Sequence, residues 1–347
     1  RPPRSTPKPS SAASDVYKRQ SEYGFDEYGA FNCSGPQMYV HDDVKSAIPF
    51  IEKSHKADKP FFINLWIHEP HTPFHVDPRL QKRFAKLGEK DAIYAATLFH
   101  ADLRIGQLLD AMHRLKITDN TLVVISSDNG PARGAPDAPL TLGYDSATGL
   151  GYGIAAAKGI TGGRKGYKAA LFEGGVGVPF IARWPGKIAA GKVDKTSIFS
   201  AVDLLPTFCE IADVKLPASY RPDGVSQVAT LKGKGKVLRE KPLFWKTVAP
   251  WPARKTKPDH WVSYAVVSKN WKFVTNRNAQ YVELYNLVTD PLEKNDLKEK
   301  HPDTVSQLKQ MLTQWQDTLP VKPTGDCLLY TSDAADEGLG VDLGGRR

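Results

Sequence analysis

The 347-residue chain is poor in cysteine and has no long apolar run. Its three cysteines, Cys33, Cys209 and Cys327, are too few for a disulfide framework or a cysteine-rich metal site. No stretch of 18 apolar residues occurs, so no membrane-spanning helix and no membrane partner are expected. Lys and Arg outnumber Asp and Glu, 47 to 38. These basic residues form no stripe with interleaved aromatics, so no nucleic-acid partner is expected.

The two ends of the chain differ from the rest. SSAASDVYKRQ, within residues 1–20, and CLLYTSDAADE, within residues 327–347, can be encoded by the two strands of one DNA sequence that resembles a sequencing-library adaptor. A disordered basic arm and an acidic tail would explain each end but not their complementarity. We therefore expect both tails to be adaptor-derived and disordered. Without the seven basic and five acidic residues of the tails, 40 basic and 33 acidic residues remain, a net charge of +7.

Between the tails, strand-like and helix-like apolar patterns alternate along the chain. Continuous apolar runs rich in branched and aromatic residues predict buried strands, and apolar residues at spacings of three and four predict helices. The strands are predicted within 59–68, 120–130 and 178–186, and the helices at 91–115 and 201–214. Such alternation is typical of an α/β fold whose mostly parallel sheet is sandwiched by helices. We predict one such catalytic domain over residues 21–218.

The remaining residues predict a smaller second unit. Residues 219–238 contain Gly, Lys and Pro, as expected of a linker. Short strand-like segments follow, and then a helix at 303–319 with apolar residues at spacings of three and four. Residues 239–320 are therefore predicted to form a C-terminal subdomain, a small antiparallel sheet with one packed helix.

The first candidate site follows the predicted strand at 120–130. Asp128 and Asn129 stand at its carboxyl end, where α/β sheets gather their binding sites. A carboxylate beside an amide carbonyl offers hard oxygen ligands suited to Ca²⁺ or Mg²⁺. The alternative is a plain tight turn, because Asn-Gly is a strong turn signal by itself.

The second candidate site is the segment HEPHTPFH, which contains His68, His71 and His75. Two prolines stiffen the loop around His71, and a rigid loop suits an imidazole that binds an anion or transfers a proton. The spacing does not place two ligands on one helix face, so zinc binding by these three residues is only weakly supported. Surface histidines on a proline-rich loop are the alternative.

The third candidate site is the glycine-rich segment GGRKGYKAALFEGG, which contains Lys165 and Lys168. Glycine lets a ligand approach the backbone closely, and lysine is a suitable point charge for an oxyanion. The segment does not match the phosphate-binding P-loop pattern, which needs Gly-Lys followed by Ser or Thr. Alone it is weak evidence for a site.

In chain order the three segments resemble the formylglycine-dependent sulfatases of the alkaline phosphatase superfamily. The resemblance covers nearly all of residues 21–319. It rests on YGFDEYG, FFINLWIHEPHTPF, TLVVISSDNGP, KAALFEGGVGVPFIARWPGKI, AVDLLPTFCEIA, RPDGVS and ELYNLVTDPLEKNDL. It implies an alkaline-phosphatase-like fold and the hydrolysis of sulfate esters on a sulfated carbohydrate or an aryl sulfate.

The resemblance also implies roles for individual residues. Asp128 and Asn129 would bind Ca²⁺, with Mg²⁺ as the alternative metal. His71 and Lys168 would bind the sulfate group and act as the catalytic residues present, while His68 would contact the substrate. Lys168 rather than Lys165 is chosen because it stands five residues before Glu173 in KAALFEGG. Export to the periplasm or the cell exterior is also expected from the resemblance.

The chain departs from the family at the nucleophile. The family makes formylglycine from a Cys/Ser-x-Pro-x-Arg motif, with a formylglycine-generating or maturase enzyme as partner, and no such motif occurs between the tails. We therefore expect an inactive fragment whose nucleophile and further metal ligands lie in a missing N-terminal part. A phosphoester or phosphonate hydrolase of the same superfamily, and a non-catalytic glycan-binding relative, are the alternatives.

Overall fold

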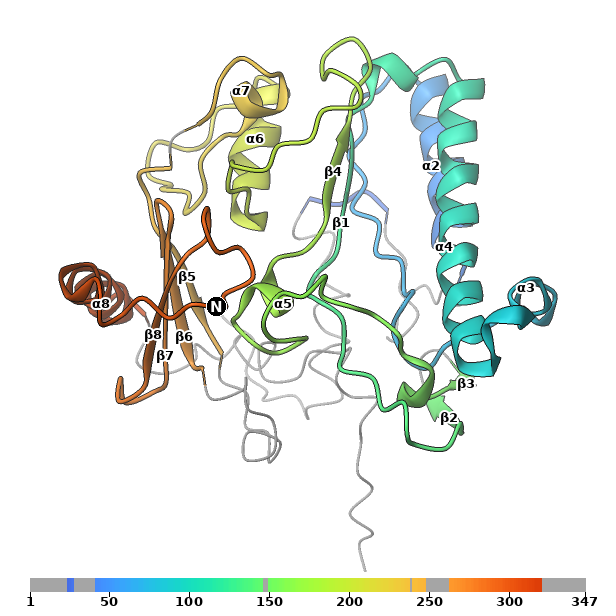
Figure 1. Cartoon of the computed structure of the whole chain (residues 1–347). Coiled ribbons are helices and arrows are strands. Elements are labelled where there is room, and N and C mark those ends of the chain that lie inside the picture. The colour runs from blue at the N-terminus through green and yellow to red at the C-terminus, as the bar shows by residue number, and fades with distance from the viewer. Residues whose placement is uncertain (1–23, 28–40, 146–148, 238, 248–261, 320–347) are drawn as a thin grey trace, which may run out of the picture. The chain divides into compact units, whose positions relative to one another are not determined.

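The computed structural model of the chain describes residues 24–27, 41–145, 149–237, 239–247 and 262–319 (Figure 1). They form two compact units, each described here by itself. The first unit holds Arg133–Gly159 and the described residues up to Ile117, and the second holds Thr118–Ala132 and Ile160–Leu319. The tails predicted to be adaptor-derived, 1–20 and 327–347, lie outside the described residues. The predicted catalytic domain, linker and subdomain boundaries stay predictions.

The first unit is mainly helical. Its long helix has Glu89 and Asp91 in the first turn and His113 and Arg114 in the last, which suits the helix dipole. Within the described residues no helix is long and apolar enough to span a membrane. The elements of this unit are α2 (Asp43–Lys56), α3 (Pro78–Arg83), η2 (Ala85–Leu87), α4 (Glu89–Arg114), β2 (Leu142–Asp145), β3 (Gly149–Tyr152) and η4 (Ile154–Ala156).

Two apolar contacts hold the first unit together. Helices α2 and α4 lie side by side, and α2 buries Val44, Ala47 and Ile51 (Figure 1). Phe74 packs with Ile93, Ala156 and Ala157, and its backbone exchanges hydrogen bonds of 2.8 and 3.0 Å with Tyr152 at the end of β3. These contacts place the loop of residues 68–75 between α4 and the β2–β3 hairpin.

The second unit begins with a two-stranded ladder and short helices. Strand β1 (Val123–Ser126) pairs antiparallel with β4 (Phe180–Arg183), with Ser126 opposite Phe180. Pro206 lies in the first turn of α6, where it removes no helical hydrogen bond. The other short elements are η3 (Thr118–Asn120), α5 (Glu173–Val176), η5 (Ala201–Asp203), α6 (Leu204–Ile211) and α7 (Val228–Leu231).

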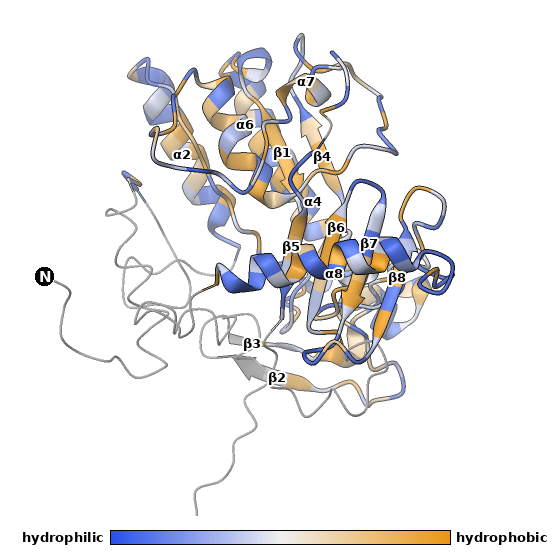
Figure 2. Ribbon diagram, turned by 90° about the vertical axis from the view of Figure 1, so that its left-hand side faces the viewer, coloured by the Kyte–Doolittle hydropathy of each residue, from blue (hydrophilic) through white to orange (hydrophobic). Residues whose placement is uncertain are grey.

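A four-stranded antiparallel sheet with one helix closes the second unit. The strands lie in the order β5 (Leu243–Lys246), β6 (Tyr264–Ser268), β7 (Trp271–Thr275) and β8 (Val282–Asn286). Successive residues alternate between its faces, as in any strand. One face packs on α8 (Pro302–Asp317) through Leu308 and Leu312, and Figure 2 shows α8 lying across these strands with both apolar and polar residues.

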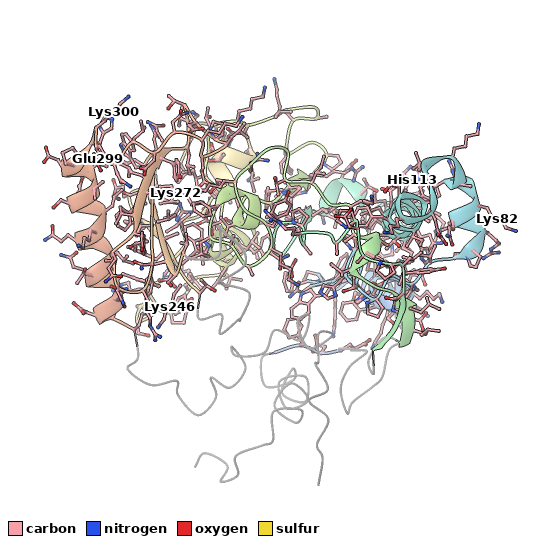
Figure 3. The ribbon with its side chains drawn as sticks, turned by 60° about the horizontal axis from the view of Figure 1, so that its bottom comes forward. Lys82, His113, Lys246, Lys272, Glu299 and Lys300 are labelled. Atoms are coloured by element: carbon pink, nitrogen blue, oxygen red, sulfur yellow. The ribbon has the colours of Figure 1, made fainter. Side chains whose placement is uncertain are left out.

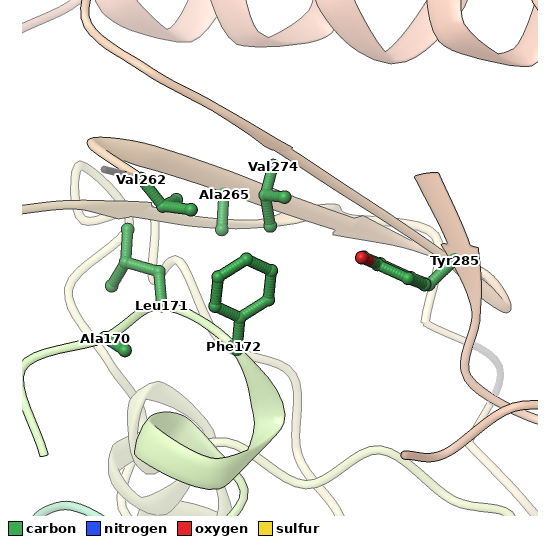
Figure 4. Close-up of a cluster of buried hydrophobic side chains, with 7 residues drawn as sticks. All are labelled: Ala170, Leu171, Phe172, Val262, Ala265, Val274 and Tyr285. Atoms are coloured by element: carbon green, nitrogen blue, oxygen red, sulfur yellow. The ribbon is translucent and has the colours of Figure 1, made fainter. Parts of the chain in front are cut away.

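The opposite face of this sheet packs on the segment before α5. Ala170, Leu171 and Phe172 contact residues of β6, β7 and β8, and the Phe172 ring lies edge-on to Tyr285 at 6.4 Å between centroids (Figure 4). The glycine-rich segment is therefore anchored on the C-terminal sheet by its apolar end. This anchor positions Lys168, two residues before Ala170.

The predicted α/β class and the C-terminal antiparallel sheet with its helix are confirmed. Residues 59–68, however, were predicted to be a buried strand, and this is wrong. They are extended but form no ladder with another described segment, and the exposed fractions of Phe62 and Trp66 are 58% and 66%. The mostly parallel pairing is not seen either, since every ladder between described strands is antiparallel. A strand requires hydrogen-bonding neighbours, which an apolar run alone does not supply.

Candidate functional site

The turn after β1 presents oxygen atoms at the carboxyl end of the strand. The backbone N–H of Asn129 donates to Oδ1 of Asp128 at 2.8 Å, and Nδ2 of Asn129 donates to the carbonyl of Gly130 at 2.8 Å. Asp128 is exposed and Asn129 is half-buried. Because these bonds use Oδ1 of Asp128 and the nitrogen of Asn129, they leave Oδ2 of Asp128 and Oδ1 of Asn129 as donors for a hard cation. The turn and the metal-ligand interpretations are thus compatible.

Backbone hydrogen bonds join this turn to the glycine-rich segment. The N–H of Gly130 donates to the carbonyl of Gly175 at 2.8 Å, and the N–H of Lys168 donates to the carbonyl of Pro131 at 2.8 Å. A Cβ at position 130 would overlap the carbonyl oxygen of Gly174. Only glycine allows this close approach. The structure therefore places the backbone of Lys168 next to the turn that carries Asp128 and Asn129.

The two lysines of the glycine-rich segment have different surroundings. Nζ of Lys165 donates to Oε2 of Glu283 at 2.7 Å and to the Tyr285 hydroxyl at 3.0 Å, and it lies 4.2 Å from the Phe172 ring centroid. Lys165 is therefore held on the C-terminal sheet. Lys168 is half-buried beside the Asp128 turn. The assignment of Lys168 as the residue that binds an oxyanion stays a prediction.

Glu173 occupies a structural position. Nζ of Lys272, whose side chain has an exposed fraction of 0%, donates to Oε1 of Glu173 at 2.7 Å and lies 3.0 Å from Oε1 of Glu293. The backbone N–H of Glu173 donates to Oε2 of Glu293 at 2.6 Å. Glu173 thus fixes the start of α5 against the sheet.

The predicted histidine loop lies in the first unit. Nδ1 of His71 lies 2.6 Å from the carbonyl of Thr72, which can only accept, so Nδ1 carries the proton. A protonated His71 would donate from Nε2, and a neutral one would accept there. The ring centroids of His71 and His75 both lie 5.7 Å from that of His68. Burial, followed by the nearby charge of His71, lowers the pKa of His68 to about 4.

A polar cluster beside this loop was not anticipated from the sequence. His41 precedes α2, Glu69 follows His68, and His100 and Arg104 stand one turn apart on α4. Nδ1 of His41 lies 2.6 Å from Oε1 of Glu69, and the His41 and His100 ring centroids are 4.5 Å apart. Arg104 contacts Oε2 of Glu69 and also Asp43. No local spacing motif links these residues, so only the folded chain assembles them.

The predicted site residues therefore divide into two groups. Asp128, Asn129 and Lys168 are brought together in the second unit by the bonds described above. His68 and His71 lie on one loop of the first unit, with His75 beside them. Each group supplies part of the predicted chemistry, oxygen ligands with a lysine in one case and imidazoles in the other.

Two protein-family models match the sequence of this chain. A model described as "Sulfatase" matches residues 10–214, and one described as "N-sulphoglucosamine sulphohydrolase, C-terminal" matches residues 164–318. The chain belongs to the sulfatase family. The first match covers more than half of the chain and both groups of candidate residues. It begins inside the tail that we assigned to an adaptor.

The relatives of this chain are distant in sequence. An N-acetylgalactosamine-6-O-sulfatase of Bacteroides thetaiotaomicron is 27% identical over 75% of this chain and 47% of its own length. The N-acetylgalactosamine-6-sulfatase of Rattus norvegicus is 26% identical over 82% of this chain and 52% of its own. The chain spans about half the length of the curated relatives it matches.

Solved structures share the fold of this sulfatase. Ps i-CgsB, crystallised with k-i-k-neocarrahexaose, has a TM-score of 0.64 and 22% identity, over 88% of this chain and 63% of that one. The PsFucS1 sulfatase from Pseudoalteromonas sp. has a TM-score of 0.55 and 22% identity, over 79% and 52%. These likenesses confirm the α/β sulfatase fold.

Proposed function

We propose that this chain is part of a sulfuric ester hydrolase that removes sulfate from a sulfated carbohydrate. The observation that carries the proposal is the backbone pairing that sets Lys168 beside Asp128 and Asn129. A sulfate ester repels a nucleophile through its dispersed negative charge, so an enzyme must neutralise the non-bridging oxygens. Relatives named N-acetylgalactosamine-6-sulfatase and arylsulfatase G support a sulfated amino sugar and an aryl sulfate alike as candidate substrates.

Each of the predicted site residues has a role in this proposal. Oδ2 of Asp128 and Oδ1 of Asn129 would hold Ca²⁺, or Mg²⁺ as the alternative, and they fit as two of the six to eight oxygen ligands that Ca²⁺ takes. The ion would supply positive charge to the sulfate oxygens. Lys168 would bind a non-bridging oxygen through Nζ, and His71 would bind the sulfate through Nε2. His68 would contact the sugar.

The nucleophile is proposed to lie outside this chain. Sulfatases use formylglycine, and no Cys/Ser-x-Pro-x-Arg motif occurs between the tails. A formylglycine-generating or maturase enzyme would therefore act on a longer parent, which we propose is exported. The 347-residue chain alone would lack turnover, because charge neutralisation without a nucleophile does not cleave the S–O bond.

The test compares the 347-residue chain with a parent protein that carries the motif. Both are assayed with a 6-sulfated N-acetylgalactosamine, an aryl sulfate and the matching aryl phosphate. We expect sulfate release by the parent only, with sulfate esters preferred over phosphate esters. A preference for phosphate esters would support a phosphoester hydrolase. Glycan binding by the parent without turnover would support a non-catalytic binding relative. Turnover by the isolated chain would refute the proposal that the nucleophile lies outside it.

A further inference from the structure

Three side chains that can ligate a metal meet in the first unit, next to the histidine loop, and none of the three has been assigned to sulfate or Ca²⁺. Ligand atoms of His41, Glu69 and His100 all lie within 4.8 Å of one another. Nδ1 of His41 and Nδ1 of His100 lie 2.6 and 3.8 Å from Oε1 of Glu69. In a tetrahedral Zn²⁺ site with bonds of about 2.0–2.2 Å, neighbouring ligand atoms are about 3.3 Å apart. The distances of 2.6 and 3.8 Å lie on either side of this value, so small side-chain adjustments would bring both nitrogens to it.

The same three atoms lack hydrogen bonds of normal geometry. Oε1 of Glu69 and Nδ1 of both histidines are buried, and none has a hydrogen-bond partner. The 2.6 Å contact of His41 with Glu69 has the distance of an ion pair without the angle of a hydrogen bond. The side chain of Glu69 has an exposed fraction of 1%. Buried polar atoms are normally satisfied, so three such atoms within 4.8 Å of one another are consistent with a bound cation.

The surrounding charges favour a cation at this centre. Arg104 contacts one carboxylate oxygen of Glu69 and one of Asp43. One cation between two carboxylates leaves a net charge of −1 when both histidines are neutral. Arg104 also holds Oε2 of Glu69, so Oε1 is directed at the imidazoles. A carboxylate that ligates a metal is usually held by a further partner, as Glu69 is held by Arg104.

We propose that His41, Glu69 and His100 form a Zn²⁺ site with a fourth position open to solvent. Two imidazoles and one carboxylate are a common ligand set for Zn²⁺ that keeps an open position. Imidazole nitrogen suits Zn²⁺ and does not suit Ca²⁺ or Mg²⁺, which prefer oxygen. The His41 and His100 side chains have exposed fractions of 20% and 26%, so the open position faces the partly exposed side of the cluster. The site adjoins the histidine loop but uses none of the residues proposed to bind sulfate, sugar or Ca²⁺.

The 347-residue chain itself is the material for the test. The metal-free protein is titrated with Zn²⁺ by calorimetry in the presence of excess Ca²⁺ and Mg²⁺, and with Co²⁺ in the visible range. We expect one equivalent of Zn²⁺ to bind, and Co²⁺ to give the absorption of a tetrahedral nitrogen–oxygen site. His41→Gln and His100→Gln should each weaken Zn²⁺ binding at least about tenfold, since even losing an outer support of a ligand costs that much.

Two control variants separate this site from other zinc-binding groups. His113 is exposed in the last turn of α4, the helix that carries His100, and is labelled in Figure 3. His113→Gln and His55→Gln, the latter at an exposed position in the last turn of α2, should both keep one equivalent of Zn²⁺ with unchanged affinity. Circular dichroism checks that the His41 and His100 variants remain folded. The proposal is overturned if the chain binds no Zn²⁺, or if both folded histidine variants bind it as tightly as the original protein.

Discussion

At the scale of single residues, the surroundings of two nearby lysines separate a structural role from a proposed functional one. Lys165 makes an ion pair with Glu283 and contacts the Phe172 ring. Lys168 is held by its backbone at the turn that follows Asp128. Counting residues in the motif had already selected Lys168, and the contacts of Lys165 supply a physical reason for that choice.

Replacing Lys168 by alanine in a parent protein that carries the nucleophile should lower kcat/KM for sulfate esters by roughly 100-fold or more, as for the loss of an oxyanion-stabilising group. The measurement is steady-state sulfate release, with thermal unfolding as a check on folding. Lys192→Ala is the matched control, because Lys192 is exposed in the same unit. A near-normal rate for Lys168→Ala would show that another cation binds the sulfate.

At the scale of elements, a buried ion-pair network joins α5 to the C-terminal sheet. Lys272, labelled in Figure 3, lies on β7 between Glu173 at the start of α5 and Glu293 after β8. Burial raises the pKa of Glu293, and the charge of Lys272 acts in the opposite direction and favours the ionised carboxylate. The network and the Phe172 cluster together hold the segment that carries Lys168.

Lys272→Met should lower the free energy of unfolding by about 3–5 kcal/mol, because two carboxylates would lose their buried cation. Denaturant unfolding measures the change. Lys246→Met is the control, since Lys246 is exposed on β5 of the same sheet. Adding Glu293→Gln to Lys272→Met should recover part of the loss. If the single variant is as stable as the original chain, the ion pairs do not stabilise the fold.

At the scale of the whole molecule, the histidine loop makes stability depend on pH. The pKa of His68 is about 4 in the folded chain because of burial and of His71, against about 6.5 when unfolded. Between these values the unfolded chain binds a proton that folded His68 does not, so stability falls as the pH falls from about 6.5 to about 4. Below about 4 this contribution changes no further.

His68→Gln should therefore reduce the loss of stability on going from about pH 7 to about pH 5, by at most about 2 kcal/mol at the lower pH. The measurement is denaturant unfolding at both pH values, with His113→Gln as the exposed control. Glu69 adds little in this window, since contacts that outweigh its burial lower its pKa to about 2, and the raised pKa of Glu293 affects the His68 variant and the original chain alike. An identical pH dependence in the His68 variant and the original chain would contradict the assignment.

The sequence predicted those parts of the molecule that depend on local pattern. Helices α4, α6 and α8 and strands β1 and β4 lie where apolar periodicity placed them. Helix α2 was not predicted, and its Pro49 lies inside the helix, where proline is normally disfavoured. Residues 59–68 were wrongly predicted to be a buried strand, because the same apolar alternation also occurs in an extended segment whose large side chains are exposed.

For the candidate site, the sequence by itself determined the residue types and the family. The order of the motifs along the chain indicated Asp128, Asn129, His71 and Lys168 as site residues, because each motif is local and has its own chemistry. Only the tertiary structure decided which distant groups share one environment. It joined Lys168 to the Asp128 turn through backbone hydrogen bonds, and it gathered the His41–Glu69–His100 cluster across 60 residues of chain. Such long-range contacts follow from tertiary packing, which the local spacing of residues does not predict.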